Sequence, residues 1–450
     1  MSLLSRRTKF FGNGMFGTIV QTMFFNVFIL AVTVLTTVIT ARMLGVEGRG
    51  VLAAALFWPG FLSSLINLGL PNSLIYHMKK GGKDNIQTYL LYSVFIQFPA
   101  SVVVGGIAWW QMPAWMAKYP PVIIELSQSL IVFHIFLLLV TNLLLAVFQS
   151  LDKFKIYNLI RFSVPTFNII GLVLLWQLGK LTVYSAILNN FLVSFLVTVW
   201  AIYLMIREIK DKWKWEWEWN NSLLVPFTRY GLRVFILELL GVLSGQLDKI
   251  IIITLLTPRE FGLYSVAFTL SRVFNVLQTA VSNVIFPKVT GLDQSDIVTK
   301  VSRGFRISMI IMGMIIIPFI LLGPFLIQLF LGKDFISSSF IFYLLSWECV
   351  IGGGSWILAQ AFNALGRPGL IVVRQAIALI VTVGLFFILA PIWGLIGISI
   401  ALLTGAMIRL AITLVSFPIV LKIPLKQVIY NKDDYQYLKS VLNLKRRGLV

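Results

Sequence analysis

The sequence predicts an all-α, polytopic membrane protein with about twelve transmembrane helices, arranged as two six-helix lobes related by a parallel pseudo-two-fold repeat. Three observations lead to this fold class. Of the 450 residues, 58% are hydrophobic and 12% are charged, a balance that soluble globular proteins do not have. Apolar runs of roughly 20 residues recur along the whole length, as membrane-spanning helices require. Two short segments also recur at nearly the same offset, which indicates a duplicated half.

The apolar runs define the expected spans one by one. The first runs from about residue 14 to 44 and is far longer than the hydrophobic region of a signal peptide, so it is expected to span the membrane. In chain order, the twelve expected spans are residues 14–43, 49–76, 86–112, 121–149, 156–178, 181–206, 226–256, 260–287, 303–331, 336–365, 369–391 and 394–421.

The net charge of +20 is distributed as membrane topology predicts. When the gaps between the spans are assigned alternately to two sides, most lysines and arginines, Arg367 and Arg374 among them, fall on one side. The other side has only Arg42, Arg49, Lys118, Lys180, Arg259 and Lys333. Because positively charged loops stay in the cytoplasm, both termini are predicted to be cytoplasmic. This distribution explains the basic balance without a nucleic-acid partner.

Two pairs of similar segments suggest the duplication. Residues 44–50 and 256–262 share their first Leu and last Gly at an offset of 212, and residues 148–153 resemble residues 362–367 at an offset of 214. Six spans precede a polar linker and six follow it, so both halves enter the membrane from the same side. The expected parts are an N-terminal six-helix lobe (1–206), a cytoplasmic Trp-rich linker (207–225), a C-terminal six-helix lobe (226–421) and a basic cytoplasmic tail (422–450).

The linker has four tryptophans that alternate with charged residues between positions 212 and 219. In an extended chain this alternation places all four indoles on one side, toward the lipid headgroups. We interpret the segment as an interfacial anchor, with binding of a partner or a sugar as the alternative. The basic tail is interpreted as a cytoplasmic segment near anionic lipid.

Ionisable residues inside the expected spans mark the candidate site. Each costs about 2.5–3.5 kcal/mol at the centre of a membrane helix, so each must face a cavity or a partner. They are Lys249, Arg272, Arg409, Asp248, Glu238 and Glu348. Ion pairs between helices are one explanation: Arg272 or Lys249 could neutralise Asp248. Glu348 could pair with Arg409 in the same way. A polar cavity is the other explanation, and we favour it for Arg272 and Arg409.

These residues divide into two candidate roles. Arg229 and Arg233 lie one helical turn apart near the cytoplasmic end of the seventh span, where they could collect phosphates or act as ordinary topology determinants. Asp248 and Glu348 are the ion-coupling candidates. The substrate-binding candidates are Arg272, Arg409, Lys249, Arg233 and Arg229.

Several chemistries are not expected from this sequence. Cys349 is the single cysteine, so no internal disulfide can form, and His77 and His134 are far apart in sequence, so no metal site is expected. The phosphate-binding G-x-x-x-x-G-K-[ST] loop and the H-E-x-x-H metal motif are both missing from the chain. We therefore expect neither a cofactor nor catalytic residues.

At this point several segments resemble bacterial polysaccharide-biosynthesis flippases of the Wzx (O-antigen) type, which belong to the multidrug/oligosaccharidyl-lipid/polysaccharide exporter superfamily. Residues 40–50 followed by 67–71 are similar to the opening of that family. Residues 246–249 followed by 262–267 resemble its second half, and residues 361–368 resemble its segment between spans ten and eleven. The resemblance covers nearly the whole chain.

The resemblance implies two six-helix lobes that form a V around a central cavity in a bacterial cytoplasmic membrane. It also implies movement of a polyprenyl-pyrophosphate-linked oligosaccharide from the cytoplasmic to the outer leaflet, and it places Asp248 at the family's acidic position in span seven. The expected partners are this lipid-linked oligosaccharide, membrane lipids and, as a further candidate, the polysaccharide polymerase machinery. We hypothesise that the membrane potential drives transport, with H⁺ or Na⁺ coupling through Asp248 or Glu348 as an addition.

Other functions remain open at this stage. An ion-coupled multidrug exporter of the same superfamily is one alternative, and a peptidoglycan-precursor flippase is another. Flippases of the latter type usually have more spans and several basic residues in span one, where this chain has only Arg42 at the outer end. A membrane enzyme such as an O-antigen polymerase or ligase fits less well, because the predicted outer loops are short.

Overall fold

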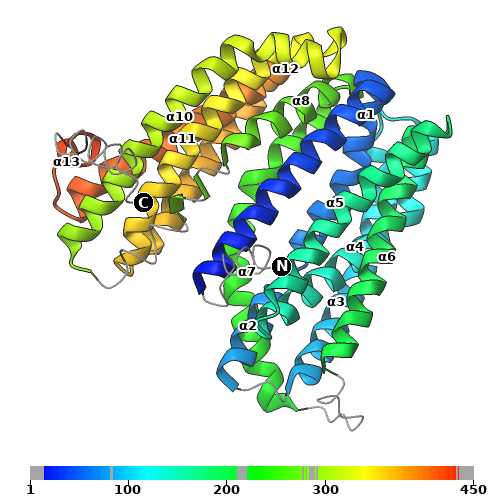
Figure 1. The fold of residues 1–450 in the computed structure, drawn as a ribbon, viewed down its shortest axis with the longest axis horizontal. Coiled ribbons are helices and arrows are strands. Elements are labelled where there is room, and N and C mark those ends of the chain that lie inside the picture. Colours follow the sequence, from blue (N-terminus) through cyan, green and yellow to red (C-terminus); the bar gives the residue numbers. More distant parts are fainter. Residues whose placement is uncertain are drawn as a thin grey trace, which may run out of the picture. The chain divides into compact units, whose positions relative to one another are not determined.

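The computed structural model describes residues 15–81, 85–209, 220–275, 278–279, 281–282, 289, 292–431 and 434. Within these residues every regular element is a helix (Figure 1), so the predicted all-α class is confirmed. The α-helices are α1 (Met15–Leu65), α2 (Leu70–Gly81), α3 (Ile86–Trp115), α4 (Pro121–Ser150), α5 (Phe154–Gln177), α6 (Val183–Ile209), α7 (Asn221–Leu255), α8 (Pro258–Ser271), α10 (Gln294–Leu331), α11 (Ser339–Ala364), α12 (Gly369–Val420) and α13 (Leu425–Ile429). Two 3₁₀ helices join them, η4 (Arg272–Phe274) and η5 (Lys333–Ser338).

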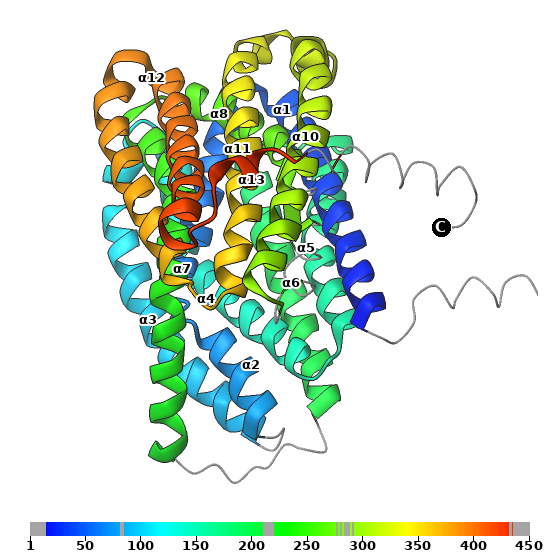
Figure 2. The ribbon, with the colours of Figure 1, turned by 90° about the vertical axis from the view of Figure 1, so that its left-hand side faces the viewer.

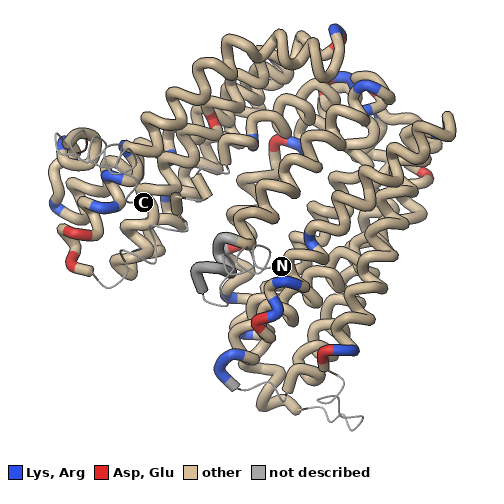
Figure 3. The backbone as a smooth tube through the Cα atoms, viewed as in Figure 1, with Lys and Arg blue, Asp and Glu red and all other residues tan. Residues whose placement is uncertain are grey.

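Eight of the described helices are long and apolar enough to cross a membrane, by length and composition. Figure 3 shows long stretches of these helices without a charged residue. Two of them have apolar stretches of 45 and 52 residues, in α1 and α12. At 1.5 Å per residue such a helix exceeds about 65 Å, more than twice the hydrocarbon thickness of a bilayer. Each is interrupted by a glycine with positive φ, Gly45 (70°) in α1 and Gly394 (54°) in α12. Helix α12 therefore covers two of the predicted spans, and α1 covers the first predicted span and part of the second.

The chain forms two compact units. The first comprises residues 1–266 and 330–335, so α7 and the beginning of α8 pack with the N-terminal helices. Its core consists of buried side chains from α2, α3, α4 and α6, among them Leu74, Tyr92, Val147 and Ala201. Helices α3, α4 and α6 lie side by side in this unit (Figure 1). The lobe boundary expected at residues 207–225 stays a prediction.

The second unit comprises residues 267–329 and 336–450. Its core joins α10, α11, α12 and α13, which Figure 2 shows from the side, through buried residues such as Val301, Leu358, Phe417 and Val428. Residues 210–219 of the expected linker, with its tryptophans, lie outside the described residues. So does the tail beyond residue 431, apart from position 434.

The turn after α4 and the turn after α11 have the same backbone structure. In residues 148–153 and in residues 362–367, the last N–H donates to the first carbonyl at 2.8 Å. The residue before the last has positive φ in both, 61° at Asp152 and 68° at Gly366. This is the usual left-handed termination of a helix. The similarity noticed in the sequence is therefore also a similarity of local structure.

Two expected spans differ from the structure. Span 49–76 is broken, because α1 ends at Leu65 and the chain turns through Leu68 and Gly69 before α2 begins. A side chain at Gly69 would collide with the backbone carbonyl of Gly231 in α7, so the turn brings two backbones into contact. In span 260–287, the 3₁₀ helix η4 interrupts the α-helix after Ser271, and the described residues 275, 278–279 and 281–282 are again α-helical. The sequence stays hydrophobic around residues 66–69 and around residues 272–274, so hydropathy alone did not predict either interruption.

Two arginines of α10 bind the C-terminal segment through hydrogen bonds and ion pairs. Arg306 donates to the carbonyl oxygens of Gln427 and Val428, both at 2.8 Å, and also pairs with Asp434. Arg303 pairs with the same carboxylate at 3.1 Å. Burial opposes ionisation of Asp434, but the hydrogen bonds and charges of the two arginines outweigh it and hold the pKa of Asp434 below its ordinary value. The segment is therefore held by charge as well as by packing.

Candidate functional site

The intramembrane charges fall into two groups, one in each compact unit. Arg272, Glu348 and Arg409 lie in the second unit. Asp248 and Lys249 lie in the first. The structure thus brings three of the sequence-predicted residues together in one cluster and two in another.

Glu348 of α11 is the centre of the larger cluster. Its two carboxylate oxygens accept from different arginines, Oε2 from Arg272 at 2.9 Å and Oε1 from Arg409 at 3.4 Å. Glu348 therefore contacts Arg409, the ion pair that we considered as the alternative to a cavity role for this arginine. Arg272, which we considered as a partner for Asp248, pairs with Glu348 instead, and its guanidinium also lies 4.2 Å from the ring centroid of Phe268.

A third arginine, Arg374 of α12, belongs to the same region. Its side chain is only 3% exposed, and its Nη1 donates to the Ser355 carbonyl at 3.1 Å, the Ser355 hydroxyl at 2.6 Å and the Thr413 hydroxyl at 2.7 Å. Thr413 lies one helical turn beyond Arg409 and donates to its carbonyl at 2.6 Å. Neutral oxygens thus hold the Arg374 side chain in place while leaving its positive charge in the protein interior.

Glycines of α11 make room for this cluster. The run at positions 352–354 looks like a helix breaker in the sequence, yet α11 is continuous through it. A side chain at Gly353 would collide with the Gln278 amide, which donates to the Cys349 carbonyl at 2.5 Å. At Gly352 an added methyl would lie 3.7 Å from both the Arg409 and the Glu348 side chains. Small residues therefore allow polar side chains to approach the helix backbone closely.

The cluster has an excess of positive charge. Among the described residues, Arg272, Arg374 and Arg409 contribute three positive charges, and Glu348 contributes one negative charge. Two of the guanidiniums are partly accessible, with side-chain exposures of 25% at Arg272 and 19% at Arg409. Because isolated charges in a membrane interior are costly, the two unbalanced charges favour an anionic ligand. Guanidinium groups bind phosphate oxygens with two parallel hydrogen bonds, so phosphate is a chemically suitable ligand.

The cluster of the first unit is centred on Asp248 of α7, which is 3% exposed. Tyr264 of α8 donates its hydroxyl to Oδ2 of Asp248, and Lys249 Nζ lies 3.4 Å from the same oxygen. Lys249 also donates to the Gly245 carbonyl at 2.9 Å. The other carboxylate oxygen, Oδ1, is buried and has no hydrogen-bond partner among the described residues. This carboxylate can accept a proton or a cation at Oδ1. Lys249 contacts Asp248 and the Gly245 carbonyl, both within α7.

Three further candidates have different surroundings. Arg229 and Arg233 are exposed on α7, outside both clusters. Glu238 accepts a hydrogen bond from the Asn72 amide of α2 at 2.6 Å, which links α2 to α7. This hydrogen bond between helices explains why Glu238 is tolerated inside the span. The roles of the two exposed arginines stay predictions.

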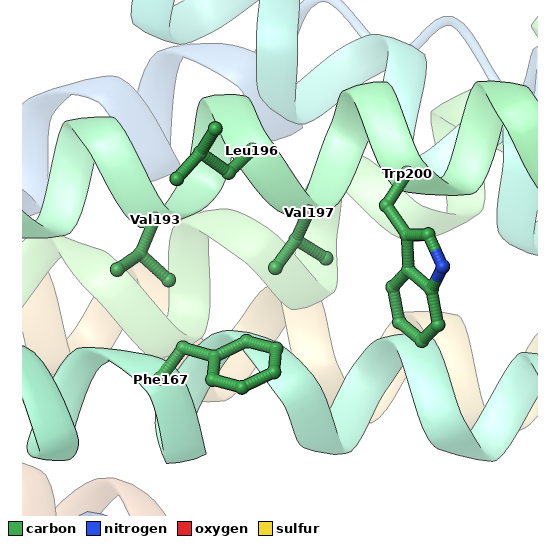
Figure 4. Close-up of a pocket in the computed structure, with 5 residues that line it drawn as sticks. All are labelled: Phe167, Val193, Leu196, Val197 and Trp200. Atoms are coloured by element: carbon green, nitrogen blue, oxygen red, sulfur yellow. The ribbon is translucent and has the colours of Figure 1, made fainter.

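A cavity of about 410 Å³ lies between α5 and α6 (Figure 4). Phe167 of α5 points toward Val193 and Val197 of α6, and Leu196 and Trp200 complete the lining. The lining is apolar, so the cavity can hold hydrocarbon but offers no charge to an anion. It is not a second candidate for the anionic ligand.

Two participants were missed by the sequence reasoning. Tyr264 is a neutral residue, and we assigned it no role although it lies in a segment that resembles the family. Arg374 was counted among the cytoplasmic topology determinants. Helical periodicity could have revealed it, because Arg374, Ala378 and Thr382 follow one another at intervals of four on the buried face of α12.

Comparison with known proteins agrees with this architecture. A structure entitled "Lipid II flippase MurJ, inward closed conformation" matches 94% of this chain and 96% of its own chain, with a TM-score of 0.76 and 14% sequence identity. An inward-facing multidrug resistance MATE family transporter of the MOP superfamily matches 87% and 95%, with a TM-score of 0.69 and 14% identity. A MATE structure in the bent conformation matches 89% and 93%, with a TM-score of 0.58 and 16% identity. Among curated proteins, none matches this sequence.

These similarities define the class: a multi-pass membrane protein with the fold of the MOP transporters. Residues 39–339 match the family described as "Polysaccharide biosynthesis protein", which is about two thirds of the chain. The protein belongs to this polysaccharide biosynthesis family. The relationship inferred from the sequence is therefore confirmed.

Proposed function

We propose that this protein is a flippase that moves a polyprenyl-pyrophosphate-linked oligosaccharide from the cytoplasmic to the outer leaflet of a bacterial cytoplasmic membrane, for surface polysaccharide synthesis. In this proposal both termini are cytoplasmic, and the protein is a transporter rather than an enzyme. The observation that carries the proposal is that Arg272 and Arg409 both contact the carboxylate of Glu348, while Arg374 lies buried against Thr413, whose hydroxyl also bonds to the Arg409 carbonyl.

The physical problem of transport explains why such a cluster is useful. Moving an ion from water into hydrocarbon costs on the order of 20 kcal/mol in the idealised case. A pyrophosphate headgroup therefore needs positive charges and hydrogen-bond donors in place of water, while its prenyl tail remains in lipid. The excess of two positive charges matches the negative charge of a pyrophosphate linked to lipid and sugar. Arg272 and Arg409 are the accessible members, and buried Arg374 adds its field and orients Thr413.

Membership of a polysaccharide biosynthesis family and the fold of the MOP transporters both support this function. The structural relative MurJ is itself described as a flippase for lipid II. We further propose that the lipid-linked substrate comes from the biosynthetic enzymes at the inner leaflet and passes to polysaccharide polymerase machinery at the outer leaflet. The membrane lipids accommodate the tail throughout.

The energy source follows from the charge of the substrate. Moving an anion outward from a negative interior gains about 2.3 kcal/mol per charge per 100 mV of membrane potential. A gradient of H⁺ or Na⁺ acting through Asp248 or Glu348 would add to this. Transport in vesicles should therefore accelerate when an inside-negative potential is imposed. Transport that responds to neither a potential nor an ion gradient would contradict this hypothesis.

One observation favours a second candidate, an ion-coupled multidrug exporter. Asp248 is a buried carboxylate with one oxygen held by Tyr264 and the other without a partner among the described residues, which is an arrangement that can bind and release a proton. Ethidium efflux that depends on Asp248 would favour this candidate. Efflux that is unchanged after deletion of the gene would count against it.

The proposal is tested by deleting the gene and complementing with Arg272→Ala, Arg374→Ala and Arg409→Ala. Lys300→Ala is the matched control, because Lys300 is an exposed base on α10 of the same unit. We expect the three cluster variants to lose surface polysaccharide while lipid-linked repeat units accumulate in the inner leaflet, and the control to restore normal polysaccharide. Cluster variants that behave like the control would overturn the proposed site. Normal polysaccharide in the deletion strain would overturn the function.

A further inference from the structure

Two buried amide side chains lie at the interruption between α1 and α2, within the first unit. Asn67 belongs to the interruption itself, and Gln97 belongs to the neighbouring helix α3. The Gln97 Nε2 donates to the Asn67 backbone carbonyl at 3.2 Å, so the two residues are in contact. Their side-chain oxygens, Asn67 Oδ1 and Gln97 Oε1, are buried and have no hydrogen-bond partner among the described residues. Gln97 as a whole is only 1% exposed.

These two amide oxygens need a positive or hydrogen-bond-donating partner. A backbone carbonyl can only accept, so the Gln97 nitrogen must face Asn67, and the assignment of the Gln97 oxygen follows from that contact. An unsatisfied oxygen is costly inside a membrane, because hydrocarbon offers no donor. The arrangement therefore points to a bound ligand that interacts with oxygen.

The backbone of the interruption favours a cation as this ligand. Helix α1 ends at Leu65 and α2 begins at Leu70, with positive φ at Leu68 (52°) and Gly69 (62°) between them. The last carbonyl groups of a helix lack intrahelical partners and carry partial negative charge. Interrupted membrane helices can coordinate Na⁺ through such carbonyls. The end of α1 thus adds oxygens and negative potential beside the two amide oxygens.

The interruption lies deep in the expected membrane. Helix α2 has 12 residues and extends about 18 Å from the interruption to Gly81. Its last turn contains Lys79 and Lys80, which belong to the side that the charge distribution predicts to be cytoplasmic. Because the hydrocarbon core is about 30 Å thick, the interruption is expected near its middle.

Glu238 of α7 brings a negative charge to the same region, where α2, α3 and α7 pack against one another (Figure 2). The Phe235 nitrogen lies 3.1 Å from the position that a methyl on Gly69 would take, so α7 passes directly beside the interruption. One turn further along α7, Glu238 Oε1 accepts from the Asn72 amide at 2.6 Å. Among the residues that the structure describes, no lysine or arginine pairs with Glu238. A cation at the two amide oxygens would balance this charge.

We propose that the interruption between α1 and α2 binds one Na⁺ through Asn67 Oδ1 and Gln97 Oε1, with Glu238 as the balancing charge. Amide and carbonyl oxygens are hard ligands that suit hard cations. One carboxylate matches a monovalent ion, and the few oxygens suit Na⁺ better than K⁺, which channels surround with rings of carbonyls. The ion stabilises the broken helix where three helices meet. This structural role is independent of the proposed transport function and of ion coupling at Asp248 or Glu348.

Thermal unfolding of the purified full-length protein tests the site. The protein in detergent, at a slightly alkaline pH that keeps carboxylates ionised, is heated in NaCl, KCl or choline chloride at equal ionic strength, and tryptophan fluorescence reports unfolding. We expect Na⁺ to raise the unfolding midpoint by about 5 °C relative to choline, because a ligand that binds only the folded state stabilises it. Equal midpoints in Na⁺ and choline would show that water satisfies the two oxygens and would overturn the proposal. An equal effect of K⁺ would overturn the choice of ion.

Replacement of Gln97 assigns the effect to the site. Gln97→Leu should abolish the difference between Na⁺ and choline. Gln128→Leu is the matched control, because Gln128 of α4 also donates its Nε2 to a carbonyl of a neighbouring helix, that of Trp109, at 2.7 Å. The control loses the same kind of hydrogen bond and should keep the full response to Na⁺. A full response in Gln97→Leu would overturn the site.

A second variant keeps the test valid if Gln97→Leu does not fold. Glu238→Gln retains an oxygen that can accept from Asn72 and removes only the charge. We expect it to raise the Na⁺ concentration needed for half of the stabilisation by about tenfold. Glu125→Gln, at an exposed position in α4, and Asp248→Asn, at a buried carboxylate outside this site, should leave that concentration unchanged. A response that is lost in Asp248→Asn and kept in Glu238→Gln would assign the ion to Asp248 and overturn the proposal.

Discussion

Replacing Glu348 with glutamine is the most informative single perturbation of the charge cluster. The substitution keeps the size of the side chain but removes the negative charge that Arg272 and Arg409 both contact, at 2.9 and 3.4 Å. Removing one partner of a fully buried ion pair costs about 3–5 kcal/mol. Because the two arginine side chains are 25% and 19% exposed, solvent screening reduces this, and we expect a loss of about 2–3 kcal/mol.

The adjacent Cys349 provides the assay. It is 2% exposed and its Sγ donates to the Asn275 amide oxygen at 2.8 Å, so a thiol-reactive fluorophore reports opening of this part of the second unit. In detergent, Glu348→Gln should lower the midpoint temperature of thiol reaction and increase reaction at lower temperature by roughly a hundredfold. Glu125→Gln, at an exposed position in α4, is the control. A midpoint for Glu348→Gln that equals or exceeds the control would refute the assignment of this residue as the counter-charge of the cluster.

Three further predictions follow from individual contacts. Tyr264→Phe removes the hydroxyl donor to Asp248 and should destabilise the first unit by about 1–3 kcal/mol in chemical unfolding; a change below 0.5 kcal/mol would argue that the bond has no structural role. Because Arg306 and its neighbour lower the pKa of Asp434, the ionised carboxylate should hold the C-terminal segment above the ordinary aspartate pKa and release it only as the pH falls through the lowered value. Protease cleavage near residue 431 should therefore stay slow from pH 5 to 8 and become fast at neutral pH in Asp434→Asn, whereas equal cleavage of both proteins would contradict this. Gly405→Ala should reduce thermal stability, because the methyl would collide with a threonine hydroxyl within α12, while Gly384→Ala, where nothing lies within 4 Å, should not; equal midpoints would show that α12 adjusts.

Much of the fold could be predicted because the hydropathy and the distribution of charge along the sequence determine where membrane spans begin and end. Hydrocarbon thickness fixes the length of each span, so the limits of α3 to α6 were close to those expected. The turn at residues 148–153 and its counterpart at residues 362–367 could be related because turn geometry depends on local residues. The break at Leu68 and Gly69 was not predicted by hydropathy, although Gly69 and Pro71 are helix breakers in the sequence. The close approach of Gly69 to Gly231 of α7 could not be predicted, because the two residues are distant in sequence.

The candidate site was predictable only in part, for the same reason. The cost of charge in a membrane identified Glu348, Arg409 and Arg272 as residues that need partners, and the contact between the first two was one of the alternatives considered. It did not identify Glu348 as the partner of Arg272, because that contact depends on which helices are neighbours. Arg374 escaped notice because a basic residue near the end of a span is usually a topology determinant. Its burial results from the face of α12 that carries it.

The central claim is that the arginine cluster moves an anionic lipid headgroup across the membrane. The most direct measurement places the purified protein in vesicles that contain a fluorescent polyprenyl-pyrophosphate-linked oligosaccharide and follows its appearance in the opposite leaflet by quenching from outside. We predict translocation by the wild-type protein, loss of translocation in the Arg272→Ala and Arg409→Ala double variant, and wild-type rates in Lys300→Ala. Translocation by the double variant at the wild-type rate would contradict the account.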